Sequence, residues 1–265
     1  MPEHSLLPAV AAVAAEAGAL ALSRWRGDFH RWSKGDASPV SEVDLAVDAF
    51  LRERLLALDP QAGWLSEETA DAPDRLARQR VWVVDPIDGT RDYIRGREGW
   101  CVSVALVERG RVVLGVLDAP ARGEVWRAAA GEGAQRFSGR GADRLAASDR
   151  RQLAGARIPA DALPKADRLF ATVHKPNSIA LRVAMVAAGE ADLIATLRWG
   201  AEWDIAAAAL IAAEAGARVT DALGLPLHFN KPEPRAFGVL ASAPGLHRAA
   251  VDHLADRAGR LASAV

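Results

Sequence analysis

Two aspartates, Asp85 and Asp88, end an apolar run and stand directly before the pair Gly89-Thr90. Carboxylates are hard oxygen ligands of the kind that Mg²⁺ prefers, and glycine lets a backbone approach a ligand closely. Free N–H groups at the start of the following segment can hold an anion. The combination favours a divalent cation that is bridged to a phosphate. Local sequence leaves one alternative open, namely that both aspartates form a turn and Asp88 caps a short helix.

Three further acids could add carboxylates to such a site. Glu67 begins a Glu-Glu pair after a short apolar segment, and adjacent carboxylates repel each other unless a cation holds them. Asp44 lies three residues after Ser41, the spacing of a capping box, and Asp204 precedes a nearly all-apolar segment. Each acid also has a purely structural explanation: a helix cap for Asp44, a complement to the helix dipole for Asp204, and an exposed acidic turn for Glu67.

The composition is that of an ordinary soluble globular protein, because 50% of the 265 residues are hydrophobic, 25% are charged and the net charge is −1. Such a charge does not favour a nucleic acid polymer or a membrane as partner, so any phosphate must bind at a local site. The single cysteine, Cys101, excludes an internal disulfide and a Cys-rich zinc site. The apolar stretch 6–22 contains Glu16 and has no basic region before it, so we expect an amphipathic helix in a cytoplasmic protein.

The acids of the first half must be positioned by two helices and a largely antiparallel sheet. Helical spacing predicts helices at residues 7–25 and 41–58. Apolar and β-branched runs predict strands at residues 64–66, 81–84, 101–107, 112–117 and 124–128, the third and fourth forming a hairpin. Two polar segments have two interpretations each: residues 31–38 form a solvated loop or an active-site flap, and residues 69–80 form a surface loop or a short helix.

The second half alternates strands and helices, which favours a mixed sheet covered by helices. Strands are predicted at residues 169–173, 191–196, 218–220 and 237–241, and helices at residues 179–188, 202–215 and 246–261. A polar stretch rich in Arg and Asp at residues 139–150 indicates a boundary. We therefore divide the chain into residues 1–140, which carry most of the acids, and residues 141–265, which close the site within one compact unit.

The string from Asp85 to Thr90 closely resembles the signature of the inositol monophosphatase superfamily, whose members are Mg-dependent and often lithium-sensitive phosphatases. Three further segments resemble family motifs in the expected order: Lys34 to Asp44, the acid pair at Glu67, and Trp203-Asp204. Ser41 stands where threonine is usual, a mild departure that keeps the hydroxyl, and Ser66 stands where a glycine usually precedes the acid pair. The resemblance implies an α/β (α+β) fold, a layered α/β/α/β/α sandwich with an antiparallel sheet in the first half and a mixed sheet in the second.

The resemblance also implies a cofactor and a mechanism. Mg²⁺ is the expected cofactor, as two ions or, with a weaker site, three. The residues implied for one ion are Glu67, Asp85 and the Ile87 carbonyl, and those for the other are Asp85, Asp88 and Asp204. The catalytic roles implied are water activation by Asp44 and Thr90 with help from Glu67, and binding of the phosphate oxygens by the N–H groups of Gly89 and Thr90.

Two local features are similar to the 3′(2′),5′-bisphosphate nucleotidase branch of this superfamily. Arg91-Asp92-Tyr93 is similar to a basic-acidic-aromatic triplet of the nucleotidases, and Glu202-Trp203 precedes Asp204 as it does in that branch. The expected substrate is therefore 3′-phosphoadenosine 5′-phosphate. Candidate substrate contacts are Lys175, Ser178 and Glu202, and a helix cap at Asn177 or Ser178 is the alternative for that segment.

Other substrates and functions stay open. An inositol phosphate is the first alternative, although Leu197 occupies the position where inositol enzymes often carry a glutamate. Histidinol phosphate and fructose 1,6-bisphosphate come next. A non-catalytic scaffold that binds a metal–phosphate ligand and a metal nuclease are alternatives from other functional classes. The expected partner is a small phosphorylated metabolite, bound by a monomer or a homodimer.

Overall fold

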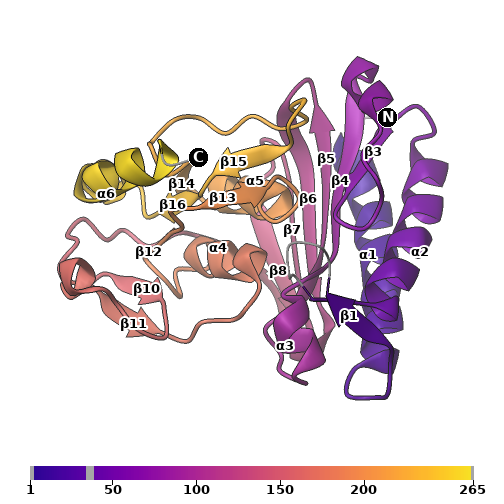
Figure 1. Ribbon diagram of the computed structural model, residues 1–265, viewed down its shortest axis with the longest axis horizontal. Coiled ribbons are helices and arrows are strands. Elements are labelled where there is room, and N and C mark those ends of the chain that lie inside the picture. Colours follow the sequence, from indigo (N-terminus) through magenta and orange to yellow (C-terminus); the bar gives the residue numbers. More distant parts are fainter. Residues whose placement is uncertain (1–2, 34–38, 264–265) are drawn as a thin grey trace.

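The computed structural model describes residues 3–33 and 39–263, and its centre is a seven-stranded sheet (Figure 1). Residues 34–38 of the segment expected as a loop or flap lie outside the described residues. The sheet order is β3-β4-β5-β6-β7-β8-β9, and all neighbours run antiparallel except the parallel pair β3 and β4. The strands are β3 (Gly63–Ser66), β4 (Arg80–Asp88), β5 (Cys101–Glu108), β6 (Arg111–Ala119), β7 (Glu124–Ala129), β8 (Ala134–Ser138) and β9 (Gly141–Arg144).

The predicted strands of the first half are confirmed, including the hairpin of β5 and β6. Arg109 and Gly110 connect these two strands with positive φ angles of 49° and 81°, as a two-residue hairpin turn of right-handed strand twist requires. Strands β8 and β9 were not predicted, because their residues are mostly polar and partly exposed. The sheet therefore continues to Arg144, slightly beyond the predicted division at residue 140.

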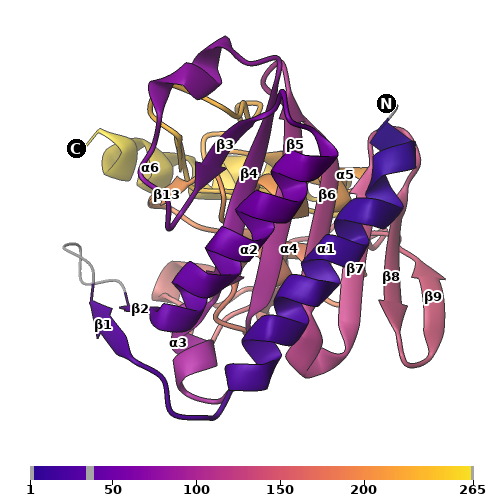
Figure 2. The same cartoon turned by 90° about the vertical axis from the view of Figure 1, so that its right-hand side faces the viewer.

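Two long helices cover one face of this sheet, α1 (Glu3–Arg24) and α2 (Glu42–Leu58) (Figure 2). Their apolar sides pack onto β4, β5 and β6 through buried residues that recur at helical spacing: Val10, Val13, Ala14, Ala17, Val43, Val47, Leu51 and Leu55. By length and composition the stretch Ser5–Arg24 could cross a membrane, but the core helix of a soluble protein can have the same length and composition. In this structure 44% of its most apolar part is buried inside the protein. The predicted helix is confirmed, and it packs within the fold.

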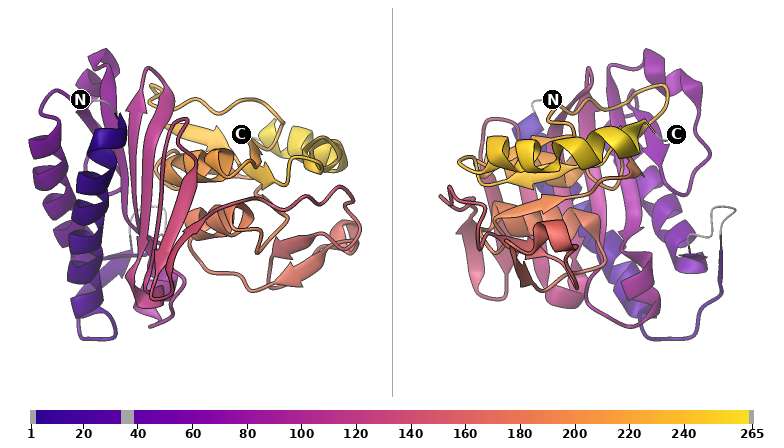
Figure 3. Two further views of the ribbon diagram at one scale, coloured as in Figure 1. Left: turned by 180° about the vertical axis from the view of Figure 1, so that it is seen from behind. Right: turned by 60° about the vertical axis from the view of Figure 1, so that its left-hand side comes forward.

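The opposite face of the sheet is covered by α4 (Ile179–Ala187) and α5 (Ala206–Glu214) (Figure 1). Both helices are almost wholly buried, since they lie between the large sheet and the strands of the second half. The short helix α3 (Thr90–Ile94) follows β4 directly, and α6 (His247–Ala262) forms the outermost layer, on the side away from α1 and α2 (Figure 3).

The layered α/β/α/β/α arrangement is confirmed, but the strands of the second half are shared among small sheets. One contains β12 (Leu193–Ala195), β16 (Leu240–Ser242) and β14 (Arg218–Thr220), and another pairs β13 (Trp199–Ala201) with β15 (Arg235–Phe237). A parallel pair joins β10 (Arg157–Pro159) to β11 (Ala171–Val173), and β1 (Arg31–Ser33) pairs with β2 (Pro39–Ser41). The strand predicted at residues 237–241 is split between β15 and β16, which belong to different sheets.

Candidate active site

The end of β4 carries both aspartates of the central motif. The strand continues past Asp85 to Asp88, and its register with β5 shifts between Asp85, opposite Ser103, and Asp88, opposite Cys101. Pro86 has no N–H to give to a ladder, so an irregularity is the place where a strand accepts it. The expected tight turn is therefore a bulged strand end. Asp85 is 2% exposed, and its carboxylate accepts a hydrogen bond of 3.0 Å from the Ile87 N–H.

Gly89 makes the connection from β4 to α3 possible. Its φ angle is +95°, and a Cβ at this position would lie 2.6 Å from the Gly99 carbonyl oxygen and 2.9 Å from the Ser178 nitrogen, so only glycine fits. Thr90 begins α3, and its hydroxyl donates to the Ile87 carbonyl at 3.0 Å. Within the described residues the N–H groups of Gly89 and Thr90 donate no hydrogen bond. They are thus available for an anion.

Asp44 lies on α2 and faces Thr90. The Thr90 hydroxyl is 3.4 Å from one carboxylate oxygen of Asp44, and the other oxygen accepts from the Ser41 N–H at 2.9 Å and the Ser41 hydroxyl at 2.5 Å. The capping box predicted at Ser41 is confirmed. Burial raises the pKa of Asp44 to about 6, although the hydrogen bonds from Ser41 oppose this rise. Asp44 therefore caps α2 and also points its second oxygen toward the motif.

Asp88 joins the two halves of the molecule. Its carboxylate accepts from the Ser178 hydroxyl at 2.5 Å, the Ala180 N–H at 2.7 Å and the Ile179 N–H at 3.3 Å, all at the N-terminus of α4. Ser178 is the N-cap of α4, which confirms the helix cap expected at Asn177 or Ser178, and it is fully buried. Burial raises the pKa of Asp88 to about 6, although the bonds from Ser178 and α4 oppose it. Asp88 thus caps a helix of the second half, and not the short helix that follows it in sequence.

Glu67 and Asp204 approach this strand end from opposite halves. The Glu67 N–H donates to the Val84 carbonyl at 3.3 Å, and Ser66, which departs from the usual glycine, donates to Asp48 on α2. Asp204 lies in the turn before α5, because α5 begins at Ala206 and not at the predicted residue 202. The sequence elements that bear these acids therefore meet at the end of β4.

The electrostatics show that the five acids converge. Burial raises the pKa of Asp85 well above its usual value, and repulsion by Glu67, Asp88, Asp204 and Asp44 raises it further. The pKa of Asp204 is likewise raised by burial and by Asp88 and Glu67, while Arg198 acts in the opposite direction. Buried carboxylates that repel one another form a donor set suited to a hard divalent cation.

The carboxylate oxygens are donors that suit Mg²⁺, although they do not surround one common centre at which an ion would be coordinated. Within residues 3–33 and 39–263, no three His, Cys, Asp or Glu side chains are arranged to hold a metal ion. Asp88 is one carboxylate that is otherwise engaged, since its oxygens accept hydrogen bonds from the N-terminus of α4. Completing a ligand set therefore needs rotation of side chains that are already near one another.

The three candidate substrate contacts lie in different environments. Glu202 is fully buried, and its oxygens accept from the N–H groups of Asn230 at 2.5 Å and Lys231 at 3.3 Å. Ser178 is buried at the α4 cap, whereas the Lys175 ammonium lies 2.6 Å from Asp161 on a groove wall. The structure thus gives Glu202 and Ser178 supporting partners, and a substrate contact by either stays a prediction.

Sequence reasoning missed Arg198. This residue lines a small cavity with Asp204 and Gly200, and its positive charge opposes the rise in the pKa of Asp204 that burial and the neighbouring acids cause. A lone arginine between two short strands has no motif around it, so only the fold brings it to the acids.

Comparisons with known proteins are consistent with this geometry. A family profile described as the inositol monophosphatase family matches residues 3–258. The 3′(2′),5′-bisphosphate nucleotidase CysQ of Aggregatibacter actinomycetemcomitans is 34% identical over 210 residues, covering 76% of this chain and 78% of the relative. A histidinol-phosphatase of Mycobacterium tuberculosis is also 34% identical, over 73% of this chain and 78% of its own. The solved structure of Thermotoga maritima IMPase superposes with a TM-score of 0.81 at 25% identity, covering 97% and 99% of the two chains.

Proposed function

Because the chain belongs to the inositol monophosphatase family, whose named relatives are phosphatases, we propose that it removes the 3′-phosphate of 3′-phosphoadenosine 5′-phosphate with Mg²⁺ as cofactor. The observation that carries the chemistry is the convergence of five carboxylates beside the free N–H groups of Gly89 and Thr90. Support for the substrate comes from the CysQ relatives and from the triplet Arg91-Asp92-Tyr93.

The metal site in this proposal uses residues from both halves. Glu67, Asp85 and the Ile87 carbonyl would hold one ion, and Asp85, Asp88 and Asp204 a second, with a weaker third near Glu67. Bound Mg²⁺ supplies a lowered pKa for water and neutralises charge on the phosphate oxygens. Asp85 has the most acidic neighbours of the set, which supports it as the ligand shared by both ions.

The chain's own groups complete the reaction. The Thr90 hydroxyl and the facing oxygen of Asp44, 3.4 Å apart, orient the attacking water, and Asp44 accepts its proton. A base with a pKa of about 6 is mostly deprotonated at neutral pH and can still take up a proton. The N–H groups of Gly89 and Thr90 hold the phosphate oxygens, where charge accumulates in the transition state.

A panel of substrates tests the proposal. Phosphate release would be measured from 3′-phosphoadenosine 5′-phosphate, inositol 1-phosphate, histidinol phosphate and fructose 1,6-bisphosphate, with Mg²⁺, with EDTA and with added Li⁺. We expect the adenosine bisphosphate to give the highest kcat/KM and EDTA to abolish turnover. A higher kcat/KM for another ester would make that ester the proposed substrate instead. The histidinol-phosphatase relative makes histidinol phosphate the second candidate. Release from none would leave a metal–phosphate-binding scaffold.

The same proposal places the protein in the cytoplasm as a monomer or a homodimer. Light scattering after gel filtration gives the mass in solution, to be compared with 28.1 kDa for one chain.

A further inference from the structure

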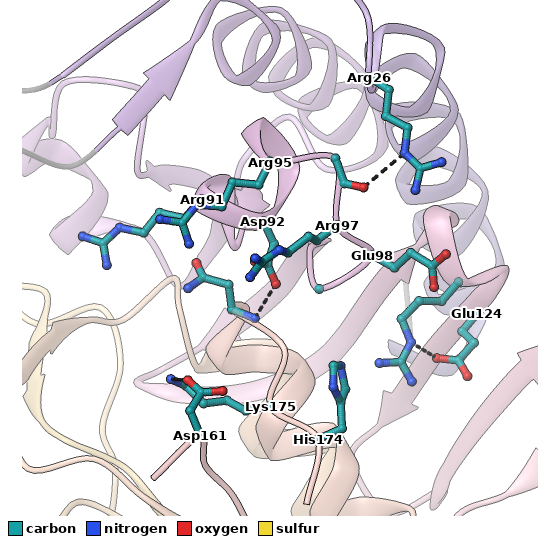
Figure 4. Close-up of a pocket in the computed structure, with 14 residues that line it drawn as sticks. Arg26, Arg91, Asp92, Arg95, Arg97, Glu98, Glu124, Asp161, His174 and Lys175 are labelled. Carbon is teal, nitrogen blue, oxygen red and sulfur yellow. Dashed lines mark hydrogen bonds and ion pairs between the residues drawn. The ribbon is translucent and has the colours of Figure 1, made fainter.

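A groove of about 1010 Å³ lies beside α3, and basic side chains dominate its walls (Figure 4). Six Arg and Lys residues line it against four Asp and Glu residues: Arg26, Arg91, Arg95, Arg97, Arg122 and Lys175 against Asp92, Glu98, Glu124 and Asp161. The whole chain has a net charge of −1, so this positive excess is local. A concave surface lined by one sign of charge concentrates ligands of the opposite sign.

Most of the acids in the groove already have partners. Glu124 accepts from Arg122 at 2.7 Å, and Asp161 pairs with Lys175 at 2.6 Å. Asp92 accepts from the Asn177 N–H at 2.9 Å. In the described part of the chain, the guanidinium groups of three arginines have neither an ion pair nor a hydrogen bond: Arg91, Arg95 and Arg97. These three cations are exposed and free to take a ligand.

Arg91 and Arg95 stand four residues apart and extend toward the same side of α3 (Figure 4). Like charges at this spacing destabilise a helix slightly unless an anion lies between them. Guanidinium groups present planar pairs of donors that match the oxygens of a phosphate. The pattern therefore suits a phosphorylated ligand better than a single carboxylate.

The groove and the site of hydrolysis share one layer of backbone. Gly99 and Asn177 line the groove, and the Gly99 carbonyl accepts from the Ser178 N–H at 2.9 Å. Gly89 packs against these same atoms from the side of the catalytic turn. A ligand in the groove is thus close to the turn without occupying the position of the hydrolysed phosphate.

We propose that this groove binds a phosphate group other than the one that is hydrolysed. The group has two sources, the second phosphate of a bisphosphate substrate or a separate phosphorylated effector. The first source rests on the function proposed above, whereas binding of a phosphate by the groove does not.

Titration of the full chain with inorganic pyrophosphate in EDTA tests the binding. Without metal the carboxylates of the proposed catalytic site repel pyrophosphate, so the measured binding comes from the groove. We expect the double variant Arg95→Gln/Arg97→Gln to weaken binding at least about tenfold, because charge-assisted hydrogen bonds are lost. The matched control, Arg140→Gln/Arg144→Gln, removes two exposed arginines from the β8–β9 hairpin and should bind as the wild type does. Thermal unfolding of each variant verifies that it is folded.

Kinetics with Mg²⁺ then identify the source of the phosphate. If the groove holds the substrate's second phosphate, the double variant raises KM for 3′-phosphoadenosine 5′-phosphate and leaves KM for adenosine 3′-phosphate unchanged. If the ligand is a separate effector, both KM values stay unchanged while pyrophosphate binding is still lost. Equal pyrophosphate affinity in the double variant and the wild type, or no wild-type binding below about 1 mM, overturns the proposal. Absence of turnover on every ester would instead contradict the proposed function and leave the titration result standing.

Discussion

Asp88 must satisfy two demands with one carboxylate. It accepts three hydrogen bonds from the N-terminal turn of α4, and in the role of metal ligand proposed above it would also turn an oxygen toward a cation. Asp88→Asn keeps an oxygen for the cap and removes the negative charge. We therefore expect Mg-dependent turnover to fall by orders of magnitude, while the free energy of unfolding falls by about 1 kcal/mol. Phosphate release at saturating Mg²⁺ and urea unfolding measure the two effects.

A matched substitution separates the metal role from the loss of a cap. Asp221 also accepts backbone hydrogen bonds, from the N–H groups of Leu223 and Leu225, in a loop of the second half. Asp221→Asn should lower stability by a similar small amount and leave turnover unchanged. Near-normal turnover of Asp88→Asn would remove Asp88 from the metal ligands.

Individual residues show which side-chain contacts can be predicted from the neighbouring sequence. The cap formed by Ser41 and Asp44 was predictable because both partners lie within four residues. The partners of Asp88 lie ninety residues further along the chain, and no pattern in the sequence around Asp88 predicts them. Arg198 was missed for the same reason.

At the scale of elements, the contact of α1 with β6 contains an unusual carboxyl group. Asp118 on β6 is 4% exposed, and one of its oxygens, which meets Gly18 of α1, has no hydrogen-bond partner among the residues that the structure describes. Burial raises the pKa of Asp118 to about 7. In the unfolded chain the group keeps its usual value, so the folded state binds the proton more tightly. Stability is therefore greatest below pH 4 for this group and declines as pH rises to about 7, by a few kcal/mol at most.

We expect Asp118→Asn to remove this decline. The variant should gain stability relative to the wild type at pH 8, where wild-type Asp118 is charged, and gain less at pH 5. Urea unfolding at the two pH values measures the difference. Asp149→Asn, which removes an exposed carboxylate outside the sheets, should leave the pH dependence as it is. Equal pH slopes for Asp118→Asn and the wild type would contradict the assignment.

Helices and strands were predicted best where their apolar residues recur with a single clear spacing. The helices α2, α4 and α6 and the strands β3 to β7 follow apolar patterns that local sequence carries. The start of α5 was misplaced because Glu202 is drawn into hydrogen bonds with Asn230 and Lys231, which holds residues 202–205 out of the helix. Tertiary partners decide such boundaries.

For the whole molecule, the layered fold and the order of the acids could be predicted, but the connection between the halves could not. Residues 69–80 were expected to form a surface loop or a short helix, and the structure has the short 3₁₀ helix η1 (Pro73–Ala77) there, in a mostly exposed segment. Arg75 is the unexpected residue of this helix, because it is only 1% exposed. Its guanidinium pairs with Asp71 through bonds of 2.6 and 2.8 Å and donates to the Asn230 side chain at 2.6 Å and the Lys231 carbonyl at 3.0 Å. A charged, Ala-rich segment gives no sign that one arginine will cross to the other half.

This connection joins two segments that carry proposed metal ligands, the one that contains Glu67 and the one that contains Asp204. Arg75 follows the Glu67 segment, and the loop it holds is the one that Glu202 holds from the other side, two residues before Asp204. Displacing the loop should therefore shift Asp204 relative to Glu67 and weaken metal binding. Arg75 is buried but its partner Asp71 is 39% exposed, so the cost of removing the guanidinium comes mainly from the acceptors left unpaired at Asn230 and Lys231, about 1–3 kcal/mol.

We accordingly expect Arg75→Met to raise the Mg²⁺ concentration needed for half-saturation by about tenfold, since misplacing one ligand by a fraction of an ångström removes on the order of 1.4 kcal/mol of binding. Arg75→Lys retains the charge and should lie between Arg75→Met and the wild type, because lysine cannot form the paired bonds. Tryptophan fluorescence during a Mg²⁺ titration follows binding without turnover, since Trp203 adjoins Asp204 in sequence. Arg78→Met, at an exposed neighbour, is the control. If Arg75→Met is folded and its titration superposes on the wild type, Arg75 stabilises the fold without positioning the metal ligands.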